Sequence, residues 1–348
     1  MRTHTKYINP LALAAVLGAV ACAEPEPTES ATAFDAPATE VSLRAIDAVL
    51  GNAAWGSFRA LGARFTTGRT VAGLAAAPTT PAAALARAWD IGAATIAKVP
   101  RIPADLRGTT FVLDPGTLQY VPDPDRSGAP ANGVRYILYA VNPLTGDPVP
   151  GAEIGHADLT DEGDELPDRV SLHLKVVSGG ITFLDYRVTA GGSESAGVLA
   201  VRGMTTDGET EVAFGVNASA RRDGGTEVVD VRFEIGIPDR GFVARAEVRN
   251  ASGAAGSAGE VAMEVHVGAD VVQLTARDTA EAVDAEFAVN GRPFATVRGD
   301  PDDPEIRSAD GHALSREERR VLRQLTQLTG RVFEMFGALM QPVGAILG

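Results

Sequence analysis

The densest group of potential metal ligands lies in one acidic segment, whose sequence DLTDEGDELPD begins at Asp158. Asp158, Asp161, Asp164 and Asp168 bring four carboxylates close together along the chain, and Gly163 permits a tight bend between them. Carboxylate oxygens are ligands that Ca²⁺ prefers. The spacing differs from that of an EF-hand loop, and a protein rich in acid has acidic loops in any case. The segment is therefore a candidate calcium site, with an ordinary solvated loop as the alternative.

The other residue types that do chemistry show no catalytic spacing. Five histidines are scattered along the chain, and no two of them stand at the separation of a metal-ligand pair. The nearest approach to the G-x-S-x-G elbow of a hydrolase is Ala255-Gly256-Ser257-Ala258-Gly259, which lacks the first glycine. We predict no catalytic residue, no cofactor other than calcium, and a protein that is not an enzyme.

The first 21 residues have the organisation of an export signal. Arg2 and Lys6 precede an uninterrupted run of apolar and small residues, LALAAVLGAVA, at 11–21. A basic start, a short apolar core and small residues at its end are typical of a secretory signal peptide. The apolar run is shorter than the roughly 20 residues needed to span a bilayer. We therefore expect the protein to be exported and residues 1–21 to be a signal peptide.

The only cysteine of the chain follows this signal directly. The sequence Ala19-Val20-Ala21-Cys22 resembles the lipobox of bacterial lipoproteins, although Ala19 stands where that family usually has Leu. The resemblance implies that Cys22 is acylated, becomes the new N-terminus and anchors the protein to the cell envelope. Ala23 rather than Asp follows the cysteine, which in the enterobacterial sorting pattern implies the outer membrane. The same residues also fit an A-x-A site for the ordinary signal peptidase, which cuts after Ala21 and adds no lipid.

Composition restricts the partners. The chain of 348 residues has 31 basic and 45 acidic residues, so its formal net charge is -14. Such a chain repels phosphate backbones, which argues against nucleic acid as a partner. It also argues against electrostatic docking on anionic lipid, so we expect membrane contact only through an N-terminal lipid. Hydrophobic residues make up 45% of the chain, which is enough for a large core.

The N-terminal part of the mature chain divides into a polar segment and two helices. Residues 22–40 are rich in Pro, Glu, Thr and Ala and poor in large apolar side chains, which predicts a disordered tether. Apolar residues at helical spacing predict an amphipathic helix over 41–65, which can break near Gly51 and Gly56. A second helix is predicted over 81–99, between two prolines.

The rest of the chain changes to strand periodicity and then ends in a helix. Over residues 108–298 apolar and polar residues alternate, as in TEVVDVRFEIGI at 226–237, and short turn sequences separate the runs. This spacing is too tight for helical crossovers, so the sheet is expected to be antiparallel. Residues 315–341 then form a predicted amphipathic helix that opens with a capping box of Ser315 and Glu318.

These elements predict an α+β, mainly β fold with a single domain over 41–348. Its centre is a large, curled antiparallel meander sheet of roughly a dozen strands, and the helical segments 41–99 and 315–341 cover its apolar face. A separate helical domain docked beside a β-sandwich is the alternative architecture.

The sequence indicates a location more strongly than an activity. We expect an exported, lipid-anchored protein of the bacterial cell envelope with a structural or interaction role and an unknown protein or lipid partner. A carrier that holds an apolar ligand inside the curled sheet is the second hypothesis. A hydrolase is the third.

Overall fold

A computed structural model describes residues 34–63, 102–163, 169–193, 196–223, 225–253, 256–279, 282–299 and 305–347. Several predictions concern residues outside these ranges, namely the signal segment with Cys22, the helix over 81–99, and the candidate ligands Asp164 and Asp168.

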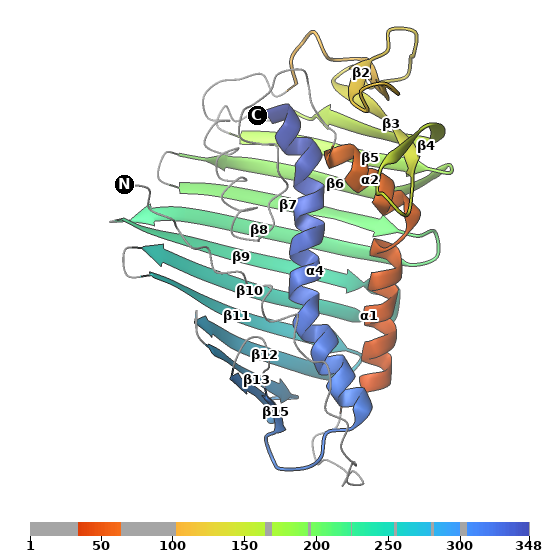
Figure 1. The fold of residues 1–348 in the computed structure, drawn as a ribbon. Coiled ribbons are helices and arrows are strands. Elements are labelled where there is room, and N and C mark those ends of the chain that lie inside the picture. The colour runs from red at the N-terminus through yellow and green to blue at the C-terminus, as the bar shows by residue number, and fades with distance from the viewer. Residues whose placement is uncertain are drawn as a thin grey trace.

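Fifteen strands in the described ranges form one open sheet (Figure 1). The strands are β1 (Thr109–Leu113), β2 (Tyr120–Pro122), β3 (Gly133–Val141), β4 (Pro148–Asp161), β5 (Arg169–Ser178), β6 (Ile181–Gly192), β7 (Ala196–Thr206), β8 (Glu211–Asp223), β9 (Thr226–Ile237), β10 (Phe242–Gly253), β11 (Gly256–Val267), β12 (Asp270–Thr279), β13 (Ala282–Val289), β14 (Arg292–Gly299) and β15 (Glu305–Ser308). From β3 to β15 each strand pairs antiparallel with the next one in sequence. The prediction of a mainly β protein built on a large antiparallel meander is confirmed, with three strands more than the predicted dozen.

One pairing departs from the antiparallel prediction. Strands β1 and β2 form a hairpin at the edge of the sheet, and β3 then pairs parallel to β1, with Thr109 opposite Val134. The parallel pairing arises because the chain returns from β2 to the free side of β1 through residues 123–132 instead of turning directly. The sheet is therefore mixed, and it has two edges, at β15 and β2.

Alternating side chains give the sheet one apolar and one polar face. On β9, Phe233 and Ile235 are 3% and 0% exposed, whereas Arg232 and Glu234 between and beside them point to solvent. A short turn is enough to join such strands: Asn290 and Gly291, between β13 and β14, both have positive φ, 52° and 76°. Two successive residues of positive φ match the right-handed twist of a hairpin, which explains the Asn-Gly pair.

The N-terminal helix begins earlier than predicted and is divided. Helix α1 spans Ala36–Leu50 and α2 spans Ala53–Ala63. Asp35 caps α1, because its Oδ1 accepts a hydrogen bond from the Ala38 N–H at 2.9 Å. Since the helix begins at Ala36, the predicted tether over 22–40 is too long at its C-terminal end. The break falls next to Gly51, as predicted, where Asn52 Oδ1 accepts from the Trp55 N–H at 2.9 Å. Gly56, the other predicted break, lies inside α2.

The C-terminal helix α4 spans Arg316–Leu347 and opens with the predicted capping box. The Glu318 N–H donates to Ser315 Oγ at 3.1 Å, and the Ser315 N–H donates to Glu318 Oε2 at 2.7 Å. The helix continues past residue 341, and Pro342 therefore lies in its interior, where a proline removes a backbone donor. The carbonyl of Leu339, one turn before Pro342, accepts a hydrogen bond of 2.6 Å from the buried Tyr186 hydroxyl on β6.

The helices lie together on the apolar side of the sheet (Figure 1), with α4 running across the strands and α1 beside it. Two ion pairs join α4 to α1. Arg320 contacts Glu40 at 2.9 Å, and Arg331 contacts Asp47. Helix α2 is tied to β7 by the buried Trp55 Nε1, which donates to Thr205 Oγ1 at 3.0 Å. A short 3₁₀ helix, η2 (Pro238–Arg240), connects β9 to β10.

The core between helices and sheet consists of buried apolar side chains from both layers. Each fully buried Leu, Ile or Phe contributes about 1.5–3 kcal/mol to the free energy of unfolding. Large side chains under 2% exposed come from both layers, for example Phe58 on α2, Phe336 on α4, and Phe242 and Phe287 on the sheet. The sheet and the helices therefore share one hydrophobic core in the described part of the chain.

The Trp55–Thr205 hydrogen bond gives a direct test of this packing. Thr205 is 0% exposed, so Thr205→Val keeps the shape of the side chain and leaves the Trp55 N–H buried without its acceptor. We expect the free energy of unfolding to fall by about 1–3 kcal/mol in urea denaturation. Thr275→Val, on the exposed side of β12, is the matched control and should change it by less than about 0.5 kcal/mol. Equal effects of the two substitutions would contradict the buried contact.

The Glu40–Arg320 pair predicts a pH dependence of the contact between α1 and α4. The hydrogen bond from Arg320, supported by the charges of Arg320 and Arg44, lowers the pKa of Glu40. A lowered pKa in the folded state stabilises the protein above the unfolded pKa of about 4.3, and this stabilisation is lost as the pH falls through the folded pKa. The stability difference between the wild type and Glu40→Gln should therefore be larger at pH 7 than at pH 3.

Urea denaturation at the two pH values measures this difference, and Glu334→Gln is the control on the exposed side of α4. A Glu40→Gln difference that is the same at pH 7 and pH 3 would show that Glu40 does not hold the two helices together as a carboxylate.

Candidate functional site: a groove on the uncovered face

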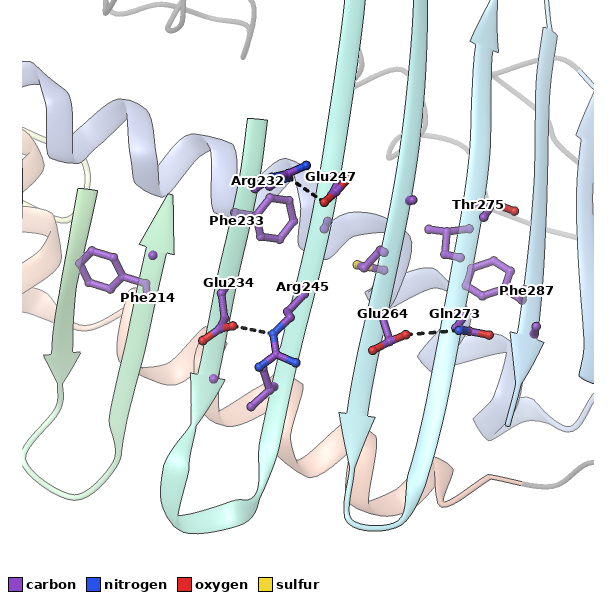
Figure 2. A pocket seen from close by; sticks show the side chains of 18 of the residues that line it. Phe214, Arg232, Phe233, Glu234, Arg245, Glu247, Glu264, Gln273, Thr275 and Phe287 are labelled. Atoms are coloured by element: carbon purple, nitrogen blue, oxygen red, sulfur yellow. Dashed lines mark hydrogen bonds and ion pairs between the residues drawn. The ribbon is translucent and has the colours of Figure 1, made fainter. Parts of the chain in front are cut away.

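A large hollow lies on the polar face of the sheet, opposite the helices (Figure 2). We call it the face groove. It has a volume of about 1300 Å³ and crosses the strands from β7, at Arg202, to β14, at Thr296. Two smaller grooves adjoin it on the same face. With neighbouring strands ~4.8 Å apart, eight strands make the face groove roughly 34 Å long.

The floor of the face groove is low because several outward positions carry small residues. Gly215 on β8 and Gly236 on β9 have no side chain, and Ala262 on β11 and Ala288 on β13 have a single methyl group. A Cβ built at Gly215 meets no atom within 4 Å, so this position opens directly into the groove. The flanking positions on the same strands carry longer side chains, which form the walls.

Charged side chains of the walls pair across neighbouring strands (Figure 2). Arg245 on β10 stands opposite Glu234 on β9, and Arg245 Nε lies 2.6 Å from Glu234 Oε2. Two residues further along the same two strands, Arg232 Nε lies 2.7 Å from Glu247 Oε1. The hydrogen bond that Arg245 donates to Glu234 raises the pKa of Arg245. These contacts hold the guanidinium groups in place at the surface of the groove.

A polar contact continues the wall toward β12. Gln273 Nε2 donates to Glu264 Oε2 at 3.3 Å, and His266 contacts the other oxygen of the same carboxylate. Hydrogen bonds from His266 and Gln273 lower the pKa of Glu264. The wall is therefore a row of paired side chains rather than a set of groups that converge on one reacting atom.

The charges of the face groove nearly cancel. Three arginines (Arg202, Arg232, Arg245) and four glutamates (Glu234, Glu247, Glu264, Glu286) line it, which leaves a formal charge of -1. The whole chain carries -14. The groove thus carries both signs of charge and a small net charge.

The predicted calcium ligands do not come together where the structure describes them. Both oxygens of Asp158 accept from Arg135, at 2.7 and 2.8 Å. Asp161 lies three residues further along β4, so its side chain leaves the opposite face of the strand. Asp164 and Asp168 lie outside the described residues, and within the described ranges no three acidic, His or Cys side chains form a metal-binding group.

One constellation of Ser, His and Asp was missed by sequence reasoning. Ser308 Oγ lies 2.6 Å from His312 Nδ1, and Asp310 contacts the same ring nitrogen. Hydrogen bonds from Ser308 and His312 hold the pKa of Asp310 well below its usual range. In a catalytic triad the serine and the acid contact opposite nitrogens of the ring. Here both contact Nδ1, and Nε2 is buried with no partner among the described residues, so the group stabilises a turn.

A second histidine also has partners on neighbouring strands. His173 Nε2 lies 2.7 Å from Asp185 Oδ1, and its Nδ1 lies 3.5 Å from Glu162 Oε1. Arg187 donates to Glu162 and lowers the pKa of that carboxyl. Alternation along each strand predicts that His173 and Asp185 both point outward. That they contact each other follows only from the register of β5 against β6, which the sequence does not give.

No protein-family model matches the chain, and comparisons with the curated proteins and with the solved structures found no match either. None of the helices in the described ranges is both long enough and apolar enough to cross a membrane.

The exposed character of the groove wall leads to a test by substitution. The side chains of Arg245 and Glu234 are 55% and 56% exposed, whereas those of Arg135 and Asp158 are 22% and 21% exposed. We expect Arg245→Gln to leave the urea midpoint close to that of the wild type, and Arg135→Gln to lower the free energy of unfolding by about 1 kcal/mol. A loss for Arg245→Gln as large as that for Arg135→Gln would contradict the solvent-facing wall.

Proposed function

We propose that the protein is a non-enzymatic, lipid-anchored interaction protein of the bacterial cell envelope, and that the polar face of its sheet is the interaction surface. The observation that carries this proposal is the face groove, which is large, lies opposite the helices, and is lined by side chains paired with one another. Paired, exposed side chains suit reversible binding, whereas catalysis needs groups that converge on a reacting atom.

The export signal and Cys22 supply the proposed location. Phe34, the first described residue, packs against Phe294 on β14, and the Asp35 N–H donates to Asp270 on β12 at 2.9 Å. The N-terminal segment therefore joins the domain at the β12–β15 end of the sheet. Eleven residues separate Cys22 from Phe34, which at full extension reach roughly 40 Å. We propose that a lipid on Cys22 holds this end of the sheet near the outer membrane.

The finer architecture forms part of the same proposal. We take the sheet to curl around α1, α2 and α4, which then occupy its trough. The dense packing of Trp55, Phe58 and Phe336 on that side supports the proposal. It also disfavours an apolar ligand between sheet and helices, because these side chains already fill the space next to the described strands.

The lipid anchor is tested by Cys22→Ser. The wild type should sediment with the membrane fraction, and the variant should appear in the soluble fraction after the cells are opened by osmotic shock. The lipobox and the ordinary signal-peptidase site both predict cleavage after Ala21, so the position of the mature N-terminus does not distinguish a lipoprotein from an unlipidated exported protein. The mass of the N-terminal peptide does, because only the lipoprotein carries acyl groups on Cys22. An unmodified Cys22 in the mature wild type would contradict the anchor.

A further inference from the structure

We infer that the face groove binds a neutral, β-linked glycan chain, which lies across the strands from β7 to β14. This inference rests on the proposed function, because it names the partner of the same surface. It is carried by three properties of the groove: its repeat along the sheet, its cancelled charge, and the hydrogen-bonding groups that its walls offer.

The first property is the repeat. Side chains that stand in register on neighbouring strands are ~4.8 Å apart, close to the length of one sugar ring in an extended glycan. An extended peptide advances about 3.4 Å per residue and falls out of step with this repeat after a few strands. A peptide also binds a sheet best by adding to an edge, and the face groove offers side chains instead of an edge.

The second property is the charge. The pairs Arg245–Glu234 and Arg232–Glu247 neutralise each other within the wall, and the formal charge of the whole groove is -1. Such a surface offers little electrostatic binding energy to a polyanion or to a polycation. The occupant that fits is a neutral chain.

The third property is the set of hydrogen-bonding groups. The bond from Arg245 to Glu234 uses Nε, so both Nη groups can still donate, and the second carboxylate oxygen can still accept. Asn217 and Thr275 add further donors and acceptors along the walls. A sugar hydroxyl is both donor and acceptor, so it can bridge such alternating groups.

An alkyl chain fits these walls less well. It would cover the exposed Arg245–Glu234 pair with hydrocarbon, and desolvating charges without new hydrogen bonds is costly. The rings of Phe233 and Phe287, which border the groove through their strands, are 3% and 1% exposed and face the core. Binding is therefore expected to depend on hydrogen bonds to the walls and on contact of the sugar rings with the small apolar residues of the floor, rather than on stacking against aromatic rings.

The test is isothermal titration of the full chain, held in phosphatidylethanolamine–phosphatidylglycerol vesicles, with cellohexaose and with chitohexaose. Gly215→Leu places a side chain into the groove from a position where a Cβ has open space, so the fold is expected to persist. Ala196→Leu, exposed at the start of β7 and outside the groove, is the matched control. We expect binding of at least one oligosaccharide, weakened tenfold or more by Gly215→Leu and unchanged by Ala196→Leu.

Two further titrations use palmitate and an uncharged hexapeptide. The inference is overturned if neither oligosaccharide binds at millimolar concentration, if Gly215→Leu binds as well as the wild type, or if palmitate or the peptide alone binds in the groove. The proposed anchor is judged separately, by whether the wild type stays with the vesicles. If the protein stays with the vesicles and binds no glycan, this inference is overturned and the proposed anchor is not.

Discussion

The burial of one face of a very wide sheet beneath the helices is the constraint on which the rest of the structure depends. A sheet with one apolar face is stable only if that face is covered. Helix α4 meets this need because it runs across the strands and so covers many of them at once. The Tyr186 hydroxyl ties α4 to the sheet by donating to the carbonyl of Leu339, one turn before Pro342, which has no backbone N–H to donate.

Covering one face leaves the other to solvent, and its charges then have to be compatible across strands. Residues in register on β9 to β15 alternate in sign without a break. The row is Asp230, Arg249, Glu260, Arg277, Asp284, Arg298 and Glu305. Like charges directly opposite each other destabilise a sheet, and opposite charges stabilise it modestly. The alternation therefore favours one register, and a slip of a strand by two residues would bring like charges together in parts of the face.

Much of the fold follows from local sequence patterns, and the site does not. The alternation in 226–237, the Asn290–Gly291 turn and the Ser315–Glu318 capping box each predict their element from neighbouring residues alone. The parallel pairing of β1 with β3 depends on where the chain goes after β2, which no local pattern records. The face groove depends on which residues of eight strands stand side by side, so it requires the register of the whole sheet. Gly215 and Ala262 read individually as weak strand residues, and only their common outward direction makes them a floor.

The open edges of the sheet explain why an interaction belongs on its face. An edge strand offers unpaired backbone groups to any other chain, and proteins limit this by keeping edges short, charged or interrupted by proline. Strand β15 has four residues, two of them charged, and β2 has three residues and ends in Pro122. Both edges are thus poor templates for another strand. The helices occupy the apolar face, which leaves the polar face as the broad surface that a partner can reach without competing with the contacts that hold the domain together.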